Sequence, residues 1–145
     1  MSVTLDANVL LYASDESSPF NPRARALLND LADGPELVYL FWPTVMAYLR
    51  ISTHPAVFGS PLAPDVAVAN VDGLLARSHV QTAGEQPRFW ERFRAVAEDA
   101  GVRGNIVSDG HVVALMKENG VSAIWTHDRD YRRFPGIDVR DPFSE

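Results

Sequence analysis

The sequence predicts an α/β domain in which a mostly parallel, five-stranded sheet carries helices on both faces. Short β-branched or apolar runs alternate along the chain with longer segments whose apolar residues recur at helical spacing. Strands that alternate with helices are typical of a parallel sheet joined by right-handed crossovers. The chain has 145 residues, 46% of them hydrophobic, which suits one core, so we expect residues 1–145 to form a single domain.

Five short runs are the expected strands. They contain apolar or β-branched residues and are bounded by turn residues, a polar loop or a helical segment. In chain order they are residues 2–6, 37–41, 79–83, 122–126 and 137–140.

Three helices are expected in the first part of the chain. Apolar residues resume directly after Asp6, so the first helix starts there and ends before the polar loop at residues 14–19. Asn21 as N-cap and Pro22 at the first helical position predict the second, which a Gly-Pro pair ends. Pro43 opens the third. Its inward-facing residues are expected to be Val45, Met46, Leu49 and Ile51.

Three more helices are expected, at residues 66–76, from Pro87 to Gly101 and at residues 107–119. The second of these interleaves arginine with aromatic residues, as surfaces that stack nucleic-acid bases do, but its helical spacing favours core packing. The residues expected on its buried face are Phe89, Trp90, Phe93, Val96, Ala97 and Ala100. The third is apolar on nearly all sides, so we expect it to be buried.

The composition limits the chemistry open to the protein. Without cysteine the chain has no disulfide, thiolate zinc site or cysteine nucleophile, so any metal must have oxygen or imidazole ligands, which favours Mg²⁺ or Mn²⁺. The net charge of −6 argues against a broad basic surface for nucleic acid. Lys117 is the only lysine among 13 basic residues, and arginine suits phosphate contacts, although genomic base composition explains this bias equally well.

The start of the chain lacks a basic segment followed by an apolar run. No stretch approaches the roughly 20 apolar residues of a membrane span. We therefore expect a cytoplasmic protein that does not bind membranes.

Carboxylates follow two of the expected strands. Asp6 ends the first strand, and Asp128 and Asp130 follow the fourth. Ligands of parallel sheets bind outside the carboxyl ends of the strands, where the strand order reverses, so these acids converge if the two strands are neighbours. Asp109 lies in the first turn of the expected helix at residues 107–119. Carboxylates crowded into one cleft repel one another unless a cation such as Mg²⁺ shares the site.

Each acid also has a simpler explanation when it is taken alone. Asp6 then only caps the following helix, and Asp109 is a helix-terminal residue with Ser108 as the cap. Asp128 and Asp130 are then solvated loop residues.

Other polar residues carry weaker signals. No two of the four histidines have the spacing of a helical zinc motif, and His127 is either a substrate contact or an inert loop residue. Asn8 either steadies the segment around Asp6 or forms an Asx turn, and Asn105 is equally ambiguous. The sequence has neither a glycine-rich phosphate loop nor a G-x-S-x-G motif.

Four segments together resemble PIN-domain toxins of the VapC type. They occur in the order of that family and span nearly the whole chain. They are residues 5–13 (LDANVLLYA), 48–58 (YLRISTHPAVF), 104–111 (GNIVSDGH) and 126–136 (THDRDYRRFPG).

The resemblance implies a magnesium- or manganese-dependent endoribonuclease, the toxin of a type II toxin–antitoxin pair. Such proteins cleave structured RNA, commonly tRNA or rRNA, are inhibited by a small cognate antitoxin and are expected to form homodimers. Asp6 and Asp109 match the principal metal-binding aspartates of the family. Asp128, with Asp130 close by, matches the acid after the fourth strand, and Thr126 matches the threonine before it.

On this interpretation, Asp6, Asp109 and Asp128 are catalytic and orient a metal-activated water, and all four aspartates are candidate metal ligands. The candidate phosphate contacts are Arg50, Arg129, Arg132 and Arg133, although Arg50 is alternatively structural and pairs with a buried carboxylate. Ala47 departs from the family pattern, because many PIN domains have a glutamate there. Its absence leaves open whether the site holds one metal ion or two, and whether Asp130 supplies the missing charge.

Two other functions remain open from the sequence. One is a PIN-fold interaction protein whose site has decayed, with Ala47 as the first loss. The other is a phosphatase of the haloacid-dehalogenase type, which would use Asp6 as a covalent nucleophile. Such enzymes usually have a second aspartate two residues later, where this chain has Asn8, and they rely on a lysine, of which Lys117 is the only one here.

Overall fold

The computed structural model describes residues 2–144 and confirms the predicted α/β architecture. Within that range, one sheet of five parallel strands has the order β3-β2-β1-β4-β5. The strands are β1 (Ser2–Leu5), β2 (Leu37–Phe41), β3 (Val80–Ala83), β4 (Ala123–Trp125) and β5 (Asp138–Arg140). All five expected strands are present, and the sheet is entirely parallel.

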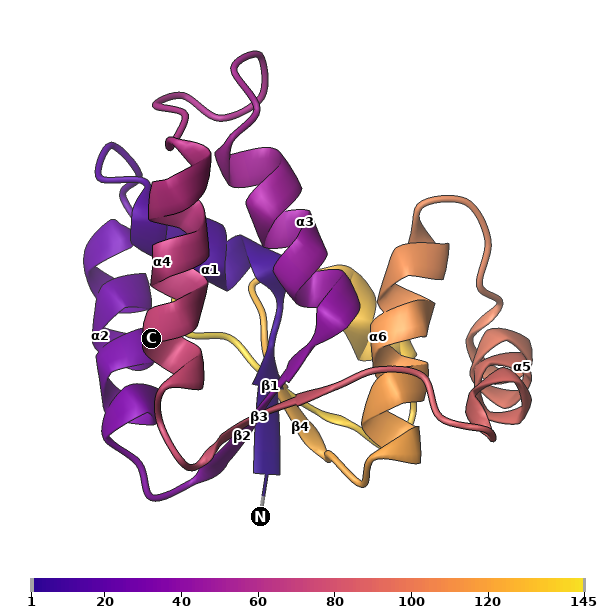
Figure 1. Cartoon of the computed structure of the whole chain (residues 1–145). Coiled ribbons are helices and arrows are strands. Elements are labelled where there is room, and N and C mark those ends of the chain that lie inside the picture. Colours follow the sequence, from indigo (N-terminus) through magenta and orange to yellow (C-terminus); the bar gives the residue numbers. More distant parts are fainter. Residues whose placement is uncertain (1, 145) are drawn as a thin grey trace.

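Helices cover both faces of the sheet, as predicted. The described residues form α1 (Ala7–Ser14), α2 (Asn21–Asp33), α3 (Trp42–Ser52), α4 (Pro64–Leu75), α5 (Phe89–Ala100), α6 (Ile106–Glu118) and the 3-10 helix η1 (Arg129–Arg133). Figure 1 shows α1 to α4 on one side of the sheet and α5 and α6 on the other. None of the helices in residues 2–144 has both the length and the apolar character that a membrane span requires.

The alternation of side chains along the strands divides the core into two layers. In β2, Val38 and Leu40 pack in the layer under α1 to α4, whereas Tyr39 and Phe41 pack in the layer under α5 and α6. Residues 112–116 of α6 are all buried, which confirms the prediction for that helix. Because both faces of the sheet are covered, a ligand can reach it only at an edge.

Three side-chain placements differ from the predictions. Asn21 is not the N-cap of α2 but its first helical residue, and its side-chain amide donates to the carbonyls of Tyr12 and Ala13 at 2.9 and 3.1 Å. Met46 and Trp90, expected to be buried, are 52% and 64% exposed. Helical spacing identifies the apolar side of a helix, but it does not show how much of that side another element covers.

Several element boundaries also shift. The helices expected at residues 66–76, from Pro87 and at 107–119 begin at Pro64, Phe89 and Ile106, respectively. The fourth strand is shorter than residues 122–126, and the following segment, expected to be a loop, includes η1. The three helix starts move by two residues or fewer, and the order of the elements is unchanged.

Candidate metal centre

β1 and β4 are neighbours at the centre of the sheet, as the predicted convergence of acids requires. Leu5 pairs with Trp125, and the backbone amide of Asp6 donates to the carbonyl of Trp125 at 3.0 Å. β2 lies on one side of β1 and β4 on the other, so the strand order reverses here. The residues that follow β1 and β4 therefore meet at the carboxyl edge of the sheet.

Thr126 joins two of the acids through its buried side chain, which is 1% exposed. Its hydroxyl donates to Asp6 Oδ2 at 2.8 Å and accepts the backbone amide hydrogen of Asp128, with 3.0 Å between Oγ1 and that nitrogen. Asp6 occupies the N-cap position of α1, and the backbone amides of Asn8 and Ala7 lie close enough to its carboxylate to oppose the rise in its pKa. Asp6 therefore does more than cap the helix, because its half-buried carboxylate is also held by Thr126 at the edge of the sheet.

Asp109, Asp128 and Asp130 form an acid cluster. One carboxylate oxygen from each lies within 4.8 Å of the others, a spacing that suits a shared metal ion. The backbone amide of Asp130 donates to Asp128 Oδ1 at 2.9 Å, which fixes these two relative to each other. Asp109 reaches the cluster from the first turn of α6. Because α6 starts at Ile106, Ser108 is not its cap.

Asp6 lies beside the acid cluster, although it was expected to be the central ligand. Among residues 2–144, the set with the spacing of metal ligands contains the other three aspartates and omits Asp6. Asp6 is nevertheless close enough for its charge to raise the pKa of Asp109. The geometry favours Asp109, Asp128 and Asp130 over Asp6 as direct ligands of a cation. The individual roles of the four aspartates remain predictions.

Burial and mutual repulsion shift the pKa values of these acids upward. Burial raises the pKa of Asp6, and the charge of Asp128 adds to the effect, while the Thr126 hydrogen bond opposes it. Burial, followed by the charges of Asp128 and Asp6, raises the pKa of Asp109 to about 6. A hydrogen bond from the buried Tyr131 hydroxyl to Asp109 partly opposes this rise. The charged form of the site is thus costly without a compensating positive charge.

The described residues supply no such positive charge directly. Within residues 2–144, no lysine, arginine or histidine forms an ion pair with any of the four aspartates. Oxygen donors with this charge and spacing fit a hard divalent cation, for which carboxylates are preferred ligands. The residues present therefore fit a hard divalent cation.

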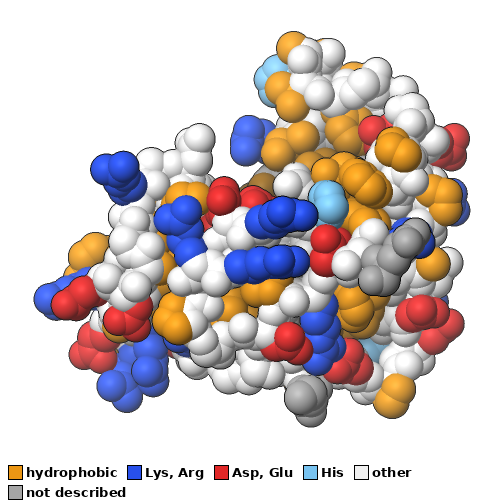
Figure 2. All heavy atoms as spheres, turned by 180° about the vertical axis from the view of Figure 1, so that it is seen from behind, with side chains coloured by type: hydrophobic (Ala, Val, Ile, Leu, Met, Phe, Trp, Pro, Cys, Tyr) orange, Lys and Arg blue, Asp and Glu red, His pale blue; other side chains and the backbone are white. Residues whose placement is uncertain are grey.

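Basic side chains lie near the acid cluster rather than in it. Arg129, Arg132 and Arg133 belong to η1, which directly follows Asp128, and all three are exposed. Figure 2 shows the back of the molecule, where blue basic and red acidic side chains lie around a histidine near the centre of the view. Arg50 is exposed in the last turn of α3 and forms no ion pair within the described residues, so the interpretation that it pairs with a buried carboxylate is wrong.

Of the other candidate residues, His127 contacts another polar side chain, whereas the two asparagines do not cap a helix. His127 Nδ1 lies 2.9 Å from Asp141 Oδ2, so His127 is not an isolated loop residue. Asn8 is exposed in the first turn of α1, and Asn105 is exposed at the start of α6 without a side-chain capping bond. Ala47 is half-buried in α3, a helix whose sequence contains no acid.

Two residues near the site were missed from the sequence. Tyr131 is 2% exposed and its hydroxyl contacts Asp109, although its place in a segment without helical or strand periodicity gave no sign of this. Asp141 contacts His127 from beyond the last strand. Its only available signal was position, because it directly follows the fifth strand as Asp6 follows the first.

Comparisons with known proteins show the family to which this fold belongs. A family model described as "PIN domain" matches residues 3–137. Ribonuclease VapC48 of Mycobacterium tuberculosis (strain H37Rv) is 49% identical over 144 residues, which cover 99% of each chain. Among solved structures, VapC20 of Mycobacterium tuberculosis, described as a sarcin–ricin loop cleaving toxin, has a TM-score of 0.68 at 14% identity and covers 96% of this chain and 99% of its own.

A toxin–antitoxin complex from Klebsiella pneumoniae also aligns, with a TM-score of 0.60 at 16% identity and 99% of each chain covered. At such low identity, the two solved structures support the fold alone. The family model and the full-length relative go further. The chain is a PIN-domain protein and belongs to the VapC family.

Proposed function

We propose that the protein is a magnesium-dependent endoribonuclease and the toxin of a toxin–antitoxin pair, and that it cleaves structured RNA such as tRNA or rRNA. The observation that carries this proposal is the acid cluster, in which three carboxylate oxygens lie within 4.8 Å of one another on a PIN domain. A full-length relative named as a ribonuclease, at 49% identity, supports the same activity.

Each residue of the site has a role in this proposal. Asp109, Asp128 and Asp130 hold the cation, with Asp6 next to them. When bound, Mg²⁺ stabilises negative charge on the phosphodiester and makes water a better nucleophile. Asp6, Asp109 and Asp128 accept hydrogen bonds from the attacking water and orient it in line with the scissile bond. Thr126 holds Asp6 in place through its 2.8 Å hydrogen bond.

The arginines of η1 are the proposed phosphate contacts. Arg129, Arg132 and Arg133 are exposed directly after Asp128, so they can bind the RNA backbone beside the acids. Their charge offsets the repulsion that an acidic site exerts on RNA. Mn²⁺ has the same ligand preference and is expected to replace Mg²⁺.

An RNA cleavage assay tests the proposal. Purified protein is incubated with pooled tRNA or rRNA in Mg²⁺ or in EDTA, and the assay is repeated for Asp6→Ala and Asp109→Ala. Asp99→Ala, an exposed aspartate on α5, is the matched control. We expect metal-dependent cleavage that is lost in both site variants and kept in the control. Undiminished cleavage by a site variant would remove that residue from the mechanism.

A catalytically weakened interaction protein is the second candidate, and Ala47 is the observation that favours it. The helix α3 supplies no acid, so the site has fewer carboxylates than many PIN domains. This candidate predicts no binding of Mg²⁺ or Mn²⁺ at millimolar concentration.

The proposed protein partner is a small cognate antitoxin. An arginine of such a partner can pair bidentately with the acid cluster and displace a cation. A cavity of about 400 Å³ between α1, α2, α3 and α4 can take an apolar segment of the same partner. Its apolar lining residues include Leu10, Leu28, Val45, Leu62, Val71 and Leu74. Co-expression with a small reading frame directly upstream of the gene should yield a complex that no longer cleaves RNA.

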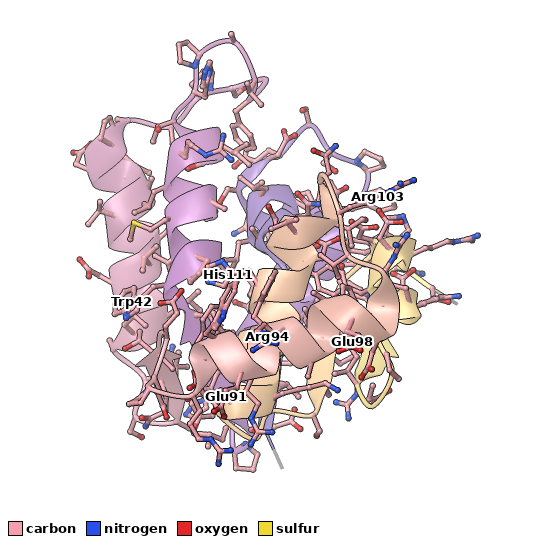
Figure 3. All side chains as sticks on the ribbon, turned by 90° about the vertical axis from the view of Figure 1, so that its right-hand side faces the viewer. Trp42, Glu91, Arg94, Glu98, Arg103 and His111 are labelled. Carbon is pink, nitrogen blue, oxygen red and sulfur yellow. The ribbon has the colours of Figure 1, made fainter. Side chains whose placement is uncertain are left out.

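We also propose a homodimer that forms through the side of the molecule seen in Figure 3. Trp42, Met46 and Trp90 are 42%, 52% and 64% exposed, so these three large apolar side chains are available for burial in an interface. Figure 3 shows Trp42 and the charged residues of α5 on this side. Light scattering should give a dimer for the wild type and a monomer for Trp90→Ser, while Val57→Ser, which changes an exposed residue beyond α3, should stay dimeric.

A further inference from the structure

Four rings from separate parts of the chain form an aromatic cluster. Tyr12 lies in α1, Phe20 precedes α2, His127 follows β4 and Phe143 lies beyond β5. The rings of Phe20 and Phe143 stack at 4.4 Å, and Tyr12 packs edge-on against them at 5.1 and 5.4 Å. His127 packs against the same two phenylalanines at 5.0 and 5.3 Å.

The aromatic cluster adjoins the acid cluster. His127 directly precedes Asp128 in the chain. Burial raises the pKa of Tyr12, and the charges of Asp6 and Asp128 contribute to the rise, which places the phenol within electrostatic reach of both carboxylates. A group that lies over His127 is therefore next to the proposed site of bond cleavage.

The His127 ring is held firmly while part of it stays open to solvent. Its Nδ1 lies 2.9 Å from Asp141 Oδ2, and the other carboxylate oxygen of Asp141 accepts the backbone amide hydrogen of Phe143, with 2.9 Å between nitrogen and oxygen. Arg23 donates to the carbonyl of Phe143 at 3.1 Å and so ties the same segment to α2. The side chain of His127 is nevertheless 43% exposed. Such a ring is pre-oriented for stacking and pays little further ordering entropy when a ligand binds.

The charges around the ring suit a nucleotide. Arg129, Arg132 and Arg133 are exposed on η1, directly after His127 and Asp128. Arg132 is near enough to Asp141 that its charge lowers the pKa of that acid. A flat ring next to guanidinium groups offers a surface for the base and donors for the phosphates of one nucleotide.

Fastening the C-terminal segment is the competing role for the aromatic cluster. The stacked Phe20 and Phe143 rings and the Arg23 contact already serve that purpose. Fastening does not require a ring at position 127 with an exposed surface next to the acids. The two roles make different predictions for variants of His127.

We infer that the exposed surface of His127, backed by the aromatic cluster, is a base-stacking subsite for an unpaired nucleotide of the RNA, next to the cleaved phosphodiester. This inference rests on the proposed function and specifies the part of the substrate that the site holds. The subsite takes a single-stranded base because a paired base is already stacked within a helix.

Binding without cleavage tests the inference independently of catalysis. In an Asp109→Asn background, which removes one repelling charge, the affinity for fluorescein-labelled oligoadenylate is measured by anisotropy. The background is compared with the same protein carrying His127→Ala, His127→Phe or His54→Ala. His54 is the matched control, an exposed histidine in the loop beyond α3.

We expect His127→Ala to raise the dissociation constant about tenfold, because stacking on one side chain contributes on the order of 1–3 kcal/mol per base. His127→Phe keeps a ring and should stay within about threefold of the background, as should His54→Ala. Thermal melting of each variant reports whether the fold is kept.

Equal affinity of the His127→Ala protein and the background would overturn the inference. So would an equal loss in His127→Ala and His127→Phe with melting unchanged, since that would assign the effect to the Asp141 contact rather than to stacking. A wild-type protein that does not cleave RNA would instead overturn the proposed function, while the binding comparison would still decide the subsite.

Discussion

Two carboxylates near the carboxyl edge of the sheet, Asp109 and Asp141, have opposite electrostatic settings. Burial acts to raise the pKa of Asp141, but hydrogen bonds from the Phe143 amide and from His127 outweigh it, so the pKa is lowered. Burial, followed by the charges of Asp128 and Asp6, raises the pKa of Asp109 to about 6. The charge of Asp141 is stabilised by groups of the chain itself, whereas the charge of Asp109 is opposed by its neighbours.

The difference separates an acid with a structural role, Asp141, from the acids of the cluster, whose arrangement suits a bound cation. Asp141 fixes a ring and a chain segment, a task that its two hydrogen bonds complete. The acid cluster gains no comparable stabilisation from the described residues, and its like charges oppose folding in the absence of a cation. An arrangement that costs stability is typical of a functional site rather than of a structural one.

The largest expected contrast is in RNA cleavage. Asp128→Asn should reduce the rate about 100-fold or more, because it removes a charge from the metal cluster while keeping the side-chain shape. Asp141→Asn should reduce it by about tenfold at most, since that residue acts only by orienting His127. Initial rates on pooled tRNA in Mg²⁺ measure both. Equal losses of cleavage rate in the two variants would contradict the assignment of Asp128 to the metal centre and of Asp141 to a structural role.

The next contrast is in the pH dependence of stability. The Asp109 pKa is about 6 in the folded protein, above its ordinary value of about 4. A carboxyl whose pKa is raised by folding contributes stability below its unfolded pKa and loses it as the pH rises through the folded pKa. Metal-free wild type should therefore lose stability between pH 4 and pH 6 relative to Asp109→Asn.

At pH 7, the Asp109→Asn protein should be the more stable by about 1 kcal/mol, a value reduced from the full pKa shift because the side chain is only half-buried. Urea unfolding in EDTA at pH 4 and pH 7 measures the difference. Asp138→Asn, at an exposed residue of β5, is the control and should show no such trend. A pH-independent difference would contradict the assignment of the raised pKa to Asp109.

The smallest expected effect comes from Tyr131→Phe. The Tyr131 hydroxyl donates to Asp109 and lowers its pKa, so its removal should raise that pKa further and weaken metal binding a few-fold. Tyr39→Phe, in the same core layer, is the matched control. Mn²⁺ titrations at pH 6 and pH 8 should show a larger loss at pH 6. An equal loss at both values would mean that the hydroxyl acts on packing rather than on the proton of Asp109.

The fold was predictable because its signals are local. The apolar run at residues 37–41 has the length of a buried strand and is bounded by turn residues. The alternation of such runs with helices then predicts the sheet type. The exposure of Trp90 was not predictable, because it depends on whether another element covers that part of α5. Membership of the PIN family also removes the haloacid-dehalogenase alternative.

The site was predictable only in part. The rule for carboxyl ends of parallel strands placed Asp6 and Asp128 at one edge, as observed. That Asp109 joins them depends on how α6 packs, which no local pattern encodes, so only the family resemblance suggested it. The spacing that groups Asp130 rather than Asp6 with the other two acids depends on η1, a 3-10 helix that no local sequence pattern predicted.

Calorimetric titration of Mn²⁺ into the metal-free protein tests the central claim most directly. The wild type should bind the ion and release protons at pH 6, because Asp109 is partly protonated there. A protein with both Asp109→Asn and Asp128→Asn should show no binding under the same conditions, while Asp141→Asn should bind as the wild type does. Absence of binding to the wild type at millimolar Mn²⁺, or unchanged binding by the double variant, would contradict the assignment of the acid cluster as the metal centre.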